Sequence, residues 1–323
     1  MIQLNQPQQI LIRNQDNIAN GIKLILSNLL LDENQIIEHF IKISNYKNLD
    51  QLIIKLSNNL AKQKCVQFIF QFISQISNLS YLELDLYQNK LDINLGVSLP
   101  TNELCKWINL NALILDLGTN NIGSSGTKTL CQELVQLKNI TILSLNLCKN
   151  NILNDGSANL GSAISCMPKI ESLHLNIGDN KIDNQGVTLL LNSLQNCQTI
   201  KKLQLEVFEN QIDGTGAINI GISISQLSNL NKLILNLNNN GIDSPGFNIM
   251  LQNISDSPSI QQMILLLLQN QASYMISSGQ NIRNFKQLNY VHIQLSKIGH
   301  SQRQNLKIQH IKKCKKLVDY IFL

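Results

Sequence analysis

The sequence predicts an α/β solenoid in which parallel strands line a concave face and helices cover the convex face. Three observations predict this fold. One motif recurs every 30 residues from position 113 onward. Each copy begins by alternating apolar and polar residues, which is the period of a half-buried strand. The rest of each copy carries apolar residues at helical spacing. Each copy is therefore a strand followed by a helix, and stacked copies share one continuous core.

The motif reads L-x-L-x-L-x-x-N-x-I-x-x-x-G, as in residues 173–186. A clear earlier copy starts at Leu82, and copies starting at Leu52 and Met263 keep the strand and the asparagine but diverge afterwards. Weaker copies start at Ile22 and Val291. The most regular copies share an asparagine and a later glycine, which are Asn120, Asn150, Asn180, Asn210 and Asn240, then Gly126, Gly156, Gly186, Gly216 and Gly246.

Each position of the motif has a physical role. In the strand 203–207, the apolar side chains point into the solenoid and the intervening ones point out of the concave face. The asparagine, such as Asn210, is expected to bond the turn of its own unit and that of the next, which satisfies buried polar groups. The glycine, such as Gly216, opens the return segment and allows close packing. The helix then buries Val187, Leu190, Leu191 and Leu194, or their equivalents.

This motif resembles the leucine-rich-repeat family, in the longer class typified by ribonuclease inhibitor. The family pattern is L-x-x-L-x-L-x-x-N-x-L, and here Ile170-x-x-Leu173-x-Leu175-x-Ile177-x-x-Asn180 carries an extra x-L step. Two added residues lengthen the strand without turning a face over. The variant is similar to repeat arrays common in ciliate protists. The resemblance extends from about residue 49 to residue 300, and it implies a fold and a binding role without naming a partner.

Three segments are expected along the chain. Residues 49–300 form the solenoid. Residues 1–48 form an N-terminal helical cap or a divergent first repeat, with a helix over 35–43. Residues 301–323 form a basic C-terminal capping helix, because apolar residues from Ile311 to Ile321 fall near one helical face and a solenoid end must be closed.

Composition favours an intracellular protein. With 43% hydrophobic and 15% charged residues among 323, the chain is too apolar to be disordered. The start has no basic and apolar leader, and the longest apolar run, residues 263–268, is too short to span a bilayer. Seven scattered cysteines without a C-x-x-C pair indicate a reducing compartment. We expect a cytoplasmic location, with association to the cytoskeleton or a cilium as a variant of it.

The sequence shows no sign of catalysis. Gly123-Ser-Ser-Gly126-Thr-Lys-Thr has the wrong spacing for a phosphate loop, and Gly126 is the repeat glycine. The five histidines lack metal-ligand spacing, and the strand carboxylates have no evident enclosed pocket. We therefore expect no catalytic residues, no cofactor and no metal, and we do not expect an enzyme.

The outward strand positions are the candidate partner-binding residues. Across the seven best strands, those columns hold no Lys or Arg and several carboxylates, which indicates a groove for a basic or polar protein segment. The alternative is that Asn and Asp merely suit a solvated strand face, and both interpretations stay open. Ile264, Leu266 and Leu268 instead indicate a terminal cap or an oligomer contact. The partner-binding candidates are Glu83, Asp85, Tyr87, Asp116, His174, Glu206 and Phe208, the two aromatic residues being candidate anchors.

The C-terminal segment has a different charge. Residues 297–323 hold seven basic residues against Asp319, which gives a net charge of +6 in a chain of formal net charge +5. A cap is the favoured interpretation, and a basic site for an acidic partner, nucleic acid or a membrane surface is the alternative. Nucleic acid is not the favoured partner, and the oligomeric state is left open. The residues of this basic site are Lys312, Lys313, Lys315 and Lys316.

Two functions follow from these features. The first is a protein-interaction scaffold that binds its partner through the concave strand face. The second is an enzyme regulator, such as an activator of a small GTPase of the Ran-activator type, which rests on fold-level similarity of the repeats.

Overall fold

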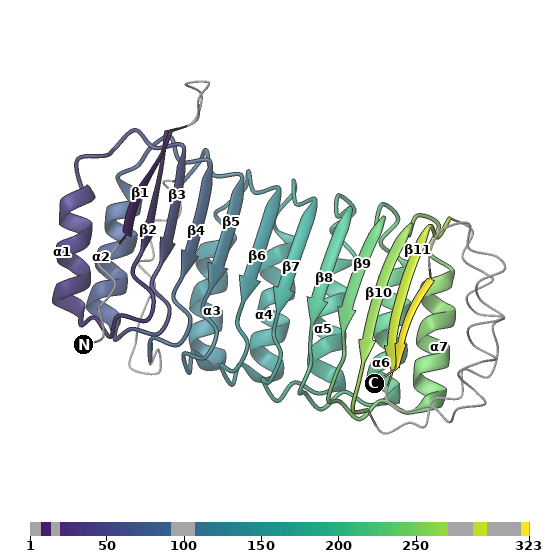
Figure 1. Ribbon diagram of the computed structural model, residues 1–323. Coiled ribbons are helices and arrows are strands. Elements are labelled where there is room, and N and C mark those ends of the chain that lie inside the picture. Colours follow the sequence, from purple (N-terminus) through teal and green to yellow (C-terminus); the bar gives the residue numbers. More distant parts are fainter. Residues whose placement is uncertain (1–7, 14–19, 92–106, 271–286, 296–317, 323) are drawn as a thin grey trace. The chain divides into compact units, whose positions relative to one another are not determined.

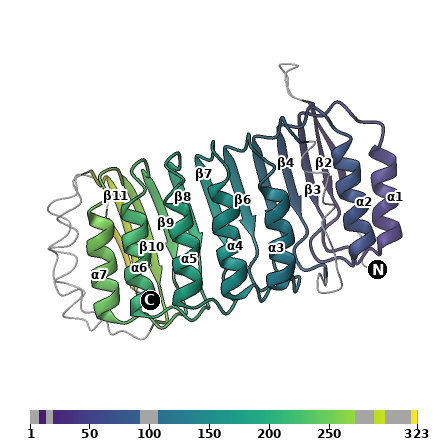
Figure 2. The ribbon, with the colours of Figure 1, turned by 180° about the vertical axis from the view of Figure 1, so that it is seen from behind.

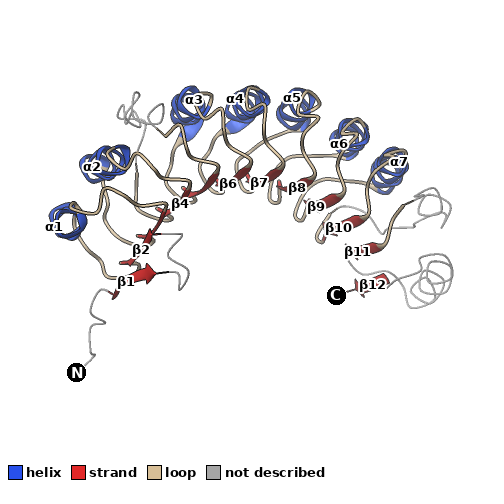
Figure 3. Ribbon diagram, turned by 90° about the horizontal axis from the view of Figure 1, so that it is seen from above, coloured by secondary structure: helices blue, strands red, loops and turns tan. Residues whose placement is uncertain are grey.

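The structure is a computed structural model of the chain, and it describes residues 8–13, 20–91, 107–270, 287–295 and 318–322 (Figure 1). The chain divides into two compact units. The first comprises residues 1–151 and 166–170, and the second comprises residues 152–165 and 171–323. Within each unit the strands form one layer, and the helices lie on one side of that layer (Figures 2 and 3).

The first unit begins with an antiparallel pair of strands and continues with parallel ones. Strand β1 pairs antiparallel with β2, and from β2 to β6 each strand pairs parallel with the next. Its elements are β1 (Gln8–Arg13), β2 (Asn20–Ile25), α1 (Glu33–Ile43), β3 (Gln51–Lys55), α2 (Gln63–Ser74), β4 (Tyr81–Asp85), β5 (Ala112–Asp116), α3 (Gly123–Leu134) and β6 (Ile142–Asn146).

The second unit continues the alternation of helix and strand. From β7 to β12 each strand pairs parallel with its successor in the chain. Its elements are α4 (Leu153–Ser165), β7 (Ser172–Asn176), α5 (Asn184–Leu194), β8 (Lys202–Glu206), α6 (Gly214–Ser225), β9 (Lys232–Asn236), α7 (Ser244–Ser255), β10 (Gln262–Leu267), β11 (Tyr290–Leu295) and β12 (Val318–Phe322).

These elements confirm the predicted fold class, an α/β leucine-rich-repeat solenoid. Each repeat strand from β4 to β10 begins one residue before the first leucine or methionine of its motif copy. The weaker copies near residues 22, 52 and 291 are also strands. Register explains the regularity, because Leu203 lies beside both Leu173 and Leu233. One ladder of buried aliphatic side chains therefore runs through the strands of each unit.

The repeat asparagines bond the turn of their own repeat, as predicted, but their second partner is the turn of the preceding repeat and not that of the next one. The side chain of Asn120 is almost fully buried. Its Nδ2 donates to the carbonyl oxygens of Leu86 at 2.8 Å and Leu117 at 3.0 Å. Its Oδ1 accepts from the backbone N–H of Asn89 at 2.8 Å and of Leu91 at 3.3 Å. Each such asparagine therefore joins its own turn to the preceding one, and removing it would leave buried backbone groups unpaired.

The repeat glycines allow the close packing that the sequence predicts. A Cβ atom on Gly186 would lie 2.3 Å from Oδ1 of Asn154, and one on Gly216 would lie 2.3 Å from Oδ1 of Asn184. Those two asparagine oxygens accept hydrogen bonds from the backbone N–H groups of Asp183 and Asp213. A side chain at the glycine position would displace this second set of hydrogen bonds, which join successive repeats.

In the N-terminal segment, strand β2 pairs parallel with β3, helix α1 follows it, and strand β1 pairs antiparallel with β2. Helix α1 covers the predicted helical segment 35–43 and starts with a capping box formed by Asp32 and Gln35. Strand β2 corresponds to the strand of the later repeats. Leu29, however, occupies the position at which those repeats have the buried asparagine. The antiparallel strand β1 was not expected, because the sequence around it lacks the repeat motif.

The C-terminal segment differs from the expectation. Residues 318–322 form strand β12, paired with β11, where a capping helix over 301–323 was predicted. The prediction of a helix was wrong for these residues because parallel pairing to β11 outweighs the helical spacing of their apolar side chains. Residues 301–317 lie outside the described part of the chain.

Candidate interaction surface

The candidate site is the side of each unit's strand layer that faces away from the helices, which we call the outward face. The described helices lie on the other side in both units (Figures 2 and 3). Strands such as β8 alternate buried residues with half-buried or exposed ones, so every second side chain reaches the outward face. All-parallel strands are normally covered on both sides. A side that no described helix covers is therefore the surface on which a partner is expected.

In the first unit, Glu83 on β4 is half-buried and already paired. Its carboxylate forms an ion pair with Nζ of Lys55, which lies on the neighbouring strand β3. Its other oxygen accepts from the Tyr81 hydroxyl at 3.2 Å. Burial, together with the charge and hydrogen bond of Glu83, raises the pKa of Tyr81 to about 12. Glu83 thus contributes less negative charge to the outward face than the sequence indicates.

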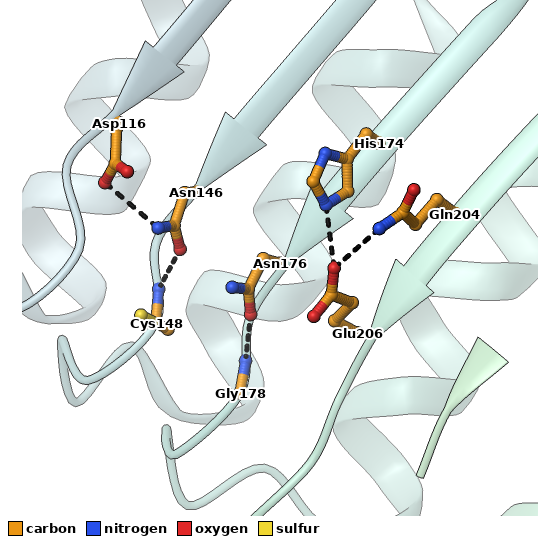
Figure 4. A network of polar contacts seen from close by, with 8 residues as sticks. All are labelled: Asp116, Asn146, Cys148, His174, Asn176, Gly178, Gln204 and Glu206. Carbon is orange, nitrogen blue, oxygen red and sulfur yellow. Dashed lines mark hydrogen bonds and ion pairs between the residues drawn. The ribbon is translucent and has the colours of Figure 1, made fainter. Parts of the chain in front are cut away.

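Asp85 and Asp116 lie side by side on β4 and β5 and share one local structure. Oδ1 of Asp85 accepts from the backbone N–H of Tyr87 at 3.1 Å, and Oδ1 of Asp116 accepts from that of Gly118 at 2.9 Å. Asparagines at the same position of other repeats accept the same hydrogen bond. These are Asn146, Asn176 and Asn236, which bond Cys148, Gly178 and Asn238 at 3.0, 3.1 and 3.2 Å (Figure 4 shows the first two).

The shared bond explains why this column is rich in Asp and Asn. Either residue type holds the end of the strand, so the solvated-strand interpretation has a structural cause. Asp116 also accepts from Nδ2 of Asn146 at 3.0 Å. Even so, burial outweighs these hydrogen bonds and raises the pKa of Asp116. The charge at Asp116 is therefore not required by the fold.

Glu206 on β8 departs from the column. Its longer side chain reaches along the outward face, where Oε1 lies 2.9 Å from Nε2 of His174 and accepts from Nε2 of Gln204 at 2.8 Å (Figure 4). The hydrogen bond from His174 is the main cause that lowers the pKa of Glu206, against the opposing effect of burial. The structure thus brings together two predicted residues, Glu206 and His174, and adds Gln204.

Each of the two candidate aromatic residues lies beside a glycine of a neighbouring repeat. A Cβ on Gly118 would be 2.8 Å from a ring carbon of Tyr87, and one on Gly178 would be 2.4 Å from ring carbons of Phe208. Both rings are half-buried. The missing side chains at Gly118 and Gly178 give the rings their space, so part of each ring's role is packing.

Lysines also lie on the outward face, and the predicted columns did not include them. They lie on β2 and β3, and also at the first residue of β8 and of β9, two residues before the first predicted column. The 30-residue spacing of Lys202 and Lys232 is the signal that would have found this pair. The outward lysines of these strands are Lys23, Lys55, Lys202 and Lys232.

The remaining predictions have varied outcomes. Ile264, Leu266 and Leu268 are half-buried on the outward side of β10 and the turn after it. The basic residues Lys312, Lys313, Lys315 and Lys316 lie outside the described residues. Cys65, Cys131, Cys148 and Cys197 are buried, and burial raises the pKa of Cys65 and of Cys131 to about 12. Cys166, which directly follows helix α4, is exposed.

The described residues contain neither a metal cluster nor a membrane-spanning helix. No group of three or more His, Cys, Asp or Glu side chains there is arranged to hold a metal ion. Among the helices described, none combines the length and the apolar character that crossing a membrane requires.

Two solved structures that are similar to this chain are distant from it in sequence. No protein-family model matches the sequence, and no curated protein does. One similar solved chain comes from the octameric complex of Latrophilin 3 (Lec, Olf), Unc5D (Ig, Ig2, TSP1) and FLRT2 (LRR), with a TM-score of 0.43 and 11% identity over 85% of this chain and 84% of that one. Another comes from the mouse RP105/MD-1 complex, with a TM-score of 0.29 and 11% identity over 83% of this chain and 58% of that one. The fold assignment rests on the repeat and the strand register.

Proposed function

We propose that the chain is a non-enzymatic interaction scaffold that binds protein partners on its outward strand faces. The observation that carries this proposal is the side of the parallel strands that no described helix covers, lined by half-buried polar, aromatic and aliphatic residues in both units. The proposal includes membership of the ribonuclease-inhibitor-like class. Repeats of about 30 residues, each with a full helix, support this class.

The first unit's face supports a basic or polar partner segment. Asp85 and Asp116 are neighbours there, and the ion pair of Glu83 with Lys55 leaves these two carboxylates as its main negative charges. Tyr87 lies at the end of the same strand and supplies an aromatic contact. A segment carrying Lys or Arg would match this arrangement in charge.

The test removes charge without removing the strand-end bonds. Asp85→Asn with Asp116→Asn keeps an Oδ1 acceptor at both positions, as Asn146 does naturally. Partners of the purified wild-type chain are identified by affinity capture and mass spectrometry, and the affinity of each for the double variant is then measured. We expect about tenfold weaker binding and a weaker dependence on salt.

The matched control is Glu38→Gln with Asp155→Asn, which removes two exposed carboxylates from helices α1 and α4. Equal affinity of the wild-type chain and the Asp85/Asp116 variant for every partner would refute the role of this face. If a captured partner is a small GTPase, stimulation of its GTP hydrolysis by the wild-type chain would favour the regulator alternative over a scaffold.

A further inference from the structure

The second unit has a different outward face, and this inference rests on the proposed function in that it names the partner chemistry of that face. The outward residues of three adjacent parallel strands make up a surface that we call the β8–β10 face. These are Lys202, Gln204, Glu206 and Phe208, then Lys232, Ile234, Asn236 and Asn238, then Gln262, Ile264, Leu266 and Leu268.

Two lysines start this face side by side. Lys202 and Lys232 are direct neighbours in the register of β8 and β9, Lys202 exposed and Lys232 half-buried. Like charges directly opposite on adjacent strands are unfavourable. The ion pairs among the described residues leave both without a carboxylate. Glu171, which directly precedes the neighbouring strand β7, pairs with Lys201 at 2.9 Å.

Aliphatic side chains follow the lysines in the strand direction. Ile234 is the next outward residue after Lys232, and it lies beside Ile264 of β10. Leu266 and Leu268 extend this apolar area along and beyond β10, and all four side chains are half-buried. The area is therefore partly accessible to solvent.

The only carboxylate among the outward residues of this face is set apart from the lysines. Glu206 is four residues beyond Lys202 on the same strand, a separation of about 13 Å along β8. It is also engaged by His174 and Gln204. Glu206 does not neutralise the lysine pair, and its negative charge opposes the approach of a polyanion to the rest of the face.

We propose that the β8–β10 face binds an extended protein segment that carries an acidic residue followed, two positions later, by an aliphatic residue. The acidic side chain lies between the ammonium groups of Lys202 and Lys232, and the aliphatic one lies against Ile234 and Ile264. The spacing follows from geometry, because successive outward residues of a strand are about 6.6 Å apart, which is also the repeat of an extended peptide.

Charge complementarity and apolar burial together favour a peptide over a nucleic acid. An acidic group relieves the repulsion between the two lysines, and an aliphatic group covers the isoleucines. A phosphate backbone would gain the first interaction and not the second, and it would meet the charge of Glu206.

The experiment uses the full chain and a displayed library of short random peptides. Selection is expected to enrich peptides with Asp or Glu two positions from Leu, Ile or Val. Their affinity is expected to fall about tenfold in Lys202→Glu with Lys232→Glu and several-fold in Ile264→Thr. Carbodiimide coupling of a bound peptide should join its carboxylate to Lys202 or Lys232, as located by mass spectrometry.

Lys181→Glu is the matched control, since it reverses an exposed lysine in a turn of the same unit, and it should leave affinity unchanged. Circular dichroism and thermal unfolding check that each variant folds. Peptides without acidic enrichment, or binding that the double variant retains, would overturn the proposal. So would binding of a single-stranded oligonucleotide that competes with the selected peptides. None of these three outcomes bears on the Asp85 and Asp116 test, so failure of this inference is distinguishable from failure of the proposed function.

Discussion

Asp116 shows how one side chain on the outward face serves both the fold and a binding surface. Its Oδ1 accepts from the backbone of Gly118 and from Nδ2 of Asn146, and both bonds need only an amide or carboxylate oxygen. Asparagine occupies the same position in other repeats and accepts the same hydrogen bond from a backbone N–H. The negative charge is therefore a property that the fold tolerates, at a cost.

That cost depends on pH. Burial raises the pKa of Asp116, so the folded state disfavours its charged form. The charge lowers stability at neutral pH, and this loss disappears as pH falls below the ordinary carboxyl pKa, about 4. We expect Asp116→Asn to raise the free energy of unfolding at pH 7 by about 0.5 kcal/mol and to leave it unchanged near pH 3. Urea titrations at both pH values measure this, and a variant less stable than wild type at pH 7 would contradict it.

At the scale of the elements, the helices of the second unit pack in two ways. A Cβ on Gly161 of α4 would lie 2.7 Å from the carbonyl oxygen of Leu190 in α5, and one on Gly221 of α6 would lie 2.6 Å from that of Met250 in α7. The same position holds Leu191 in α5 and Leu251 in α7. The helices therefore alternate between glycine and leucine at this position, so that this feature recurs at every second repeat.

This close approach makes Gly161→Ala a test of helix packing. Alanine in a helix interior is normally about 1 kcal/mol more favourable than glycine. Here the added Cβ would meet the backbone of Leu190, so we expect α4 and α5 to be forced apart at a net cost of about 1–3 kcal/mol. Chemical unfolding followed by circular dichroism measures the change. Ser162→Ala, at the exposed neighbouring position, is the control, and stabilisation by Gly161→Ala would show that the helices yield easily.

At the scale of the whole molecule, charge is unevenly distributed along the chain. Residues 297–323 have a net charge of +6 within a total of +5, so the other residues sum to about −1. Part of this basic segment is strand β12, which pairs with β11. The segment therefore has a structural role in the second unit that is independent of its charge.

Truncation after residue 296 separates these roles. Removing β12 leaves the edge of β11 unpaired, and exposed strand edges promote association. We expect the truncated chain to unfold at a lower temperature and to self-associate with rising concentration in analytical ultracentrifugation. Glutamine at Lys312, Lys313, Lys315 and Lys316 changes only the charge and should behave as wild type. A truncated chain with unchanged unfolding temperature and mass would show that β12 contributes nothing.

Much of the fold could be predicted because a single period specifies it. Alternation of apolar and polar residues determines which side chains of a strand are buried, and a constant 30-residue spacing places equal positions side by side. The buried asparagines followed from the same spacing. The hairpin strand β1 and the terminal strand β12 could not be predicted, because each lacks the motif and is held by pairing with a neighbour.

The sequence by itself thus determined the repeats from β4 to β10, their buried strand positions and most of the residues that reach the outward face. Only the tertiary structure decided which of those residues have charge or surface to offer a partner. It pairs Glu83 with Lys55, engages Glu206 with His174, ties Asp85 and Asp116 into strand ends, and leaves Lys202 beside Lys232. The physical reason is that the repeat period fixes positions, whereas the length and rotamer of each side chain determine which groups meet across strands.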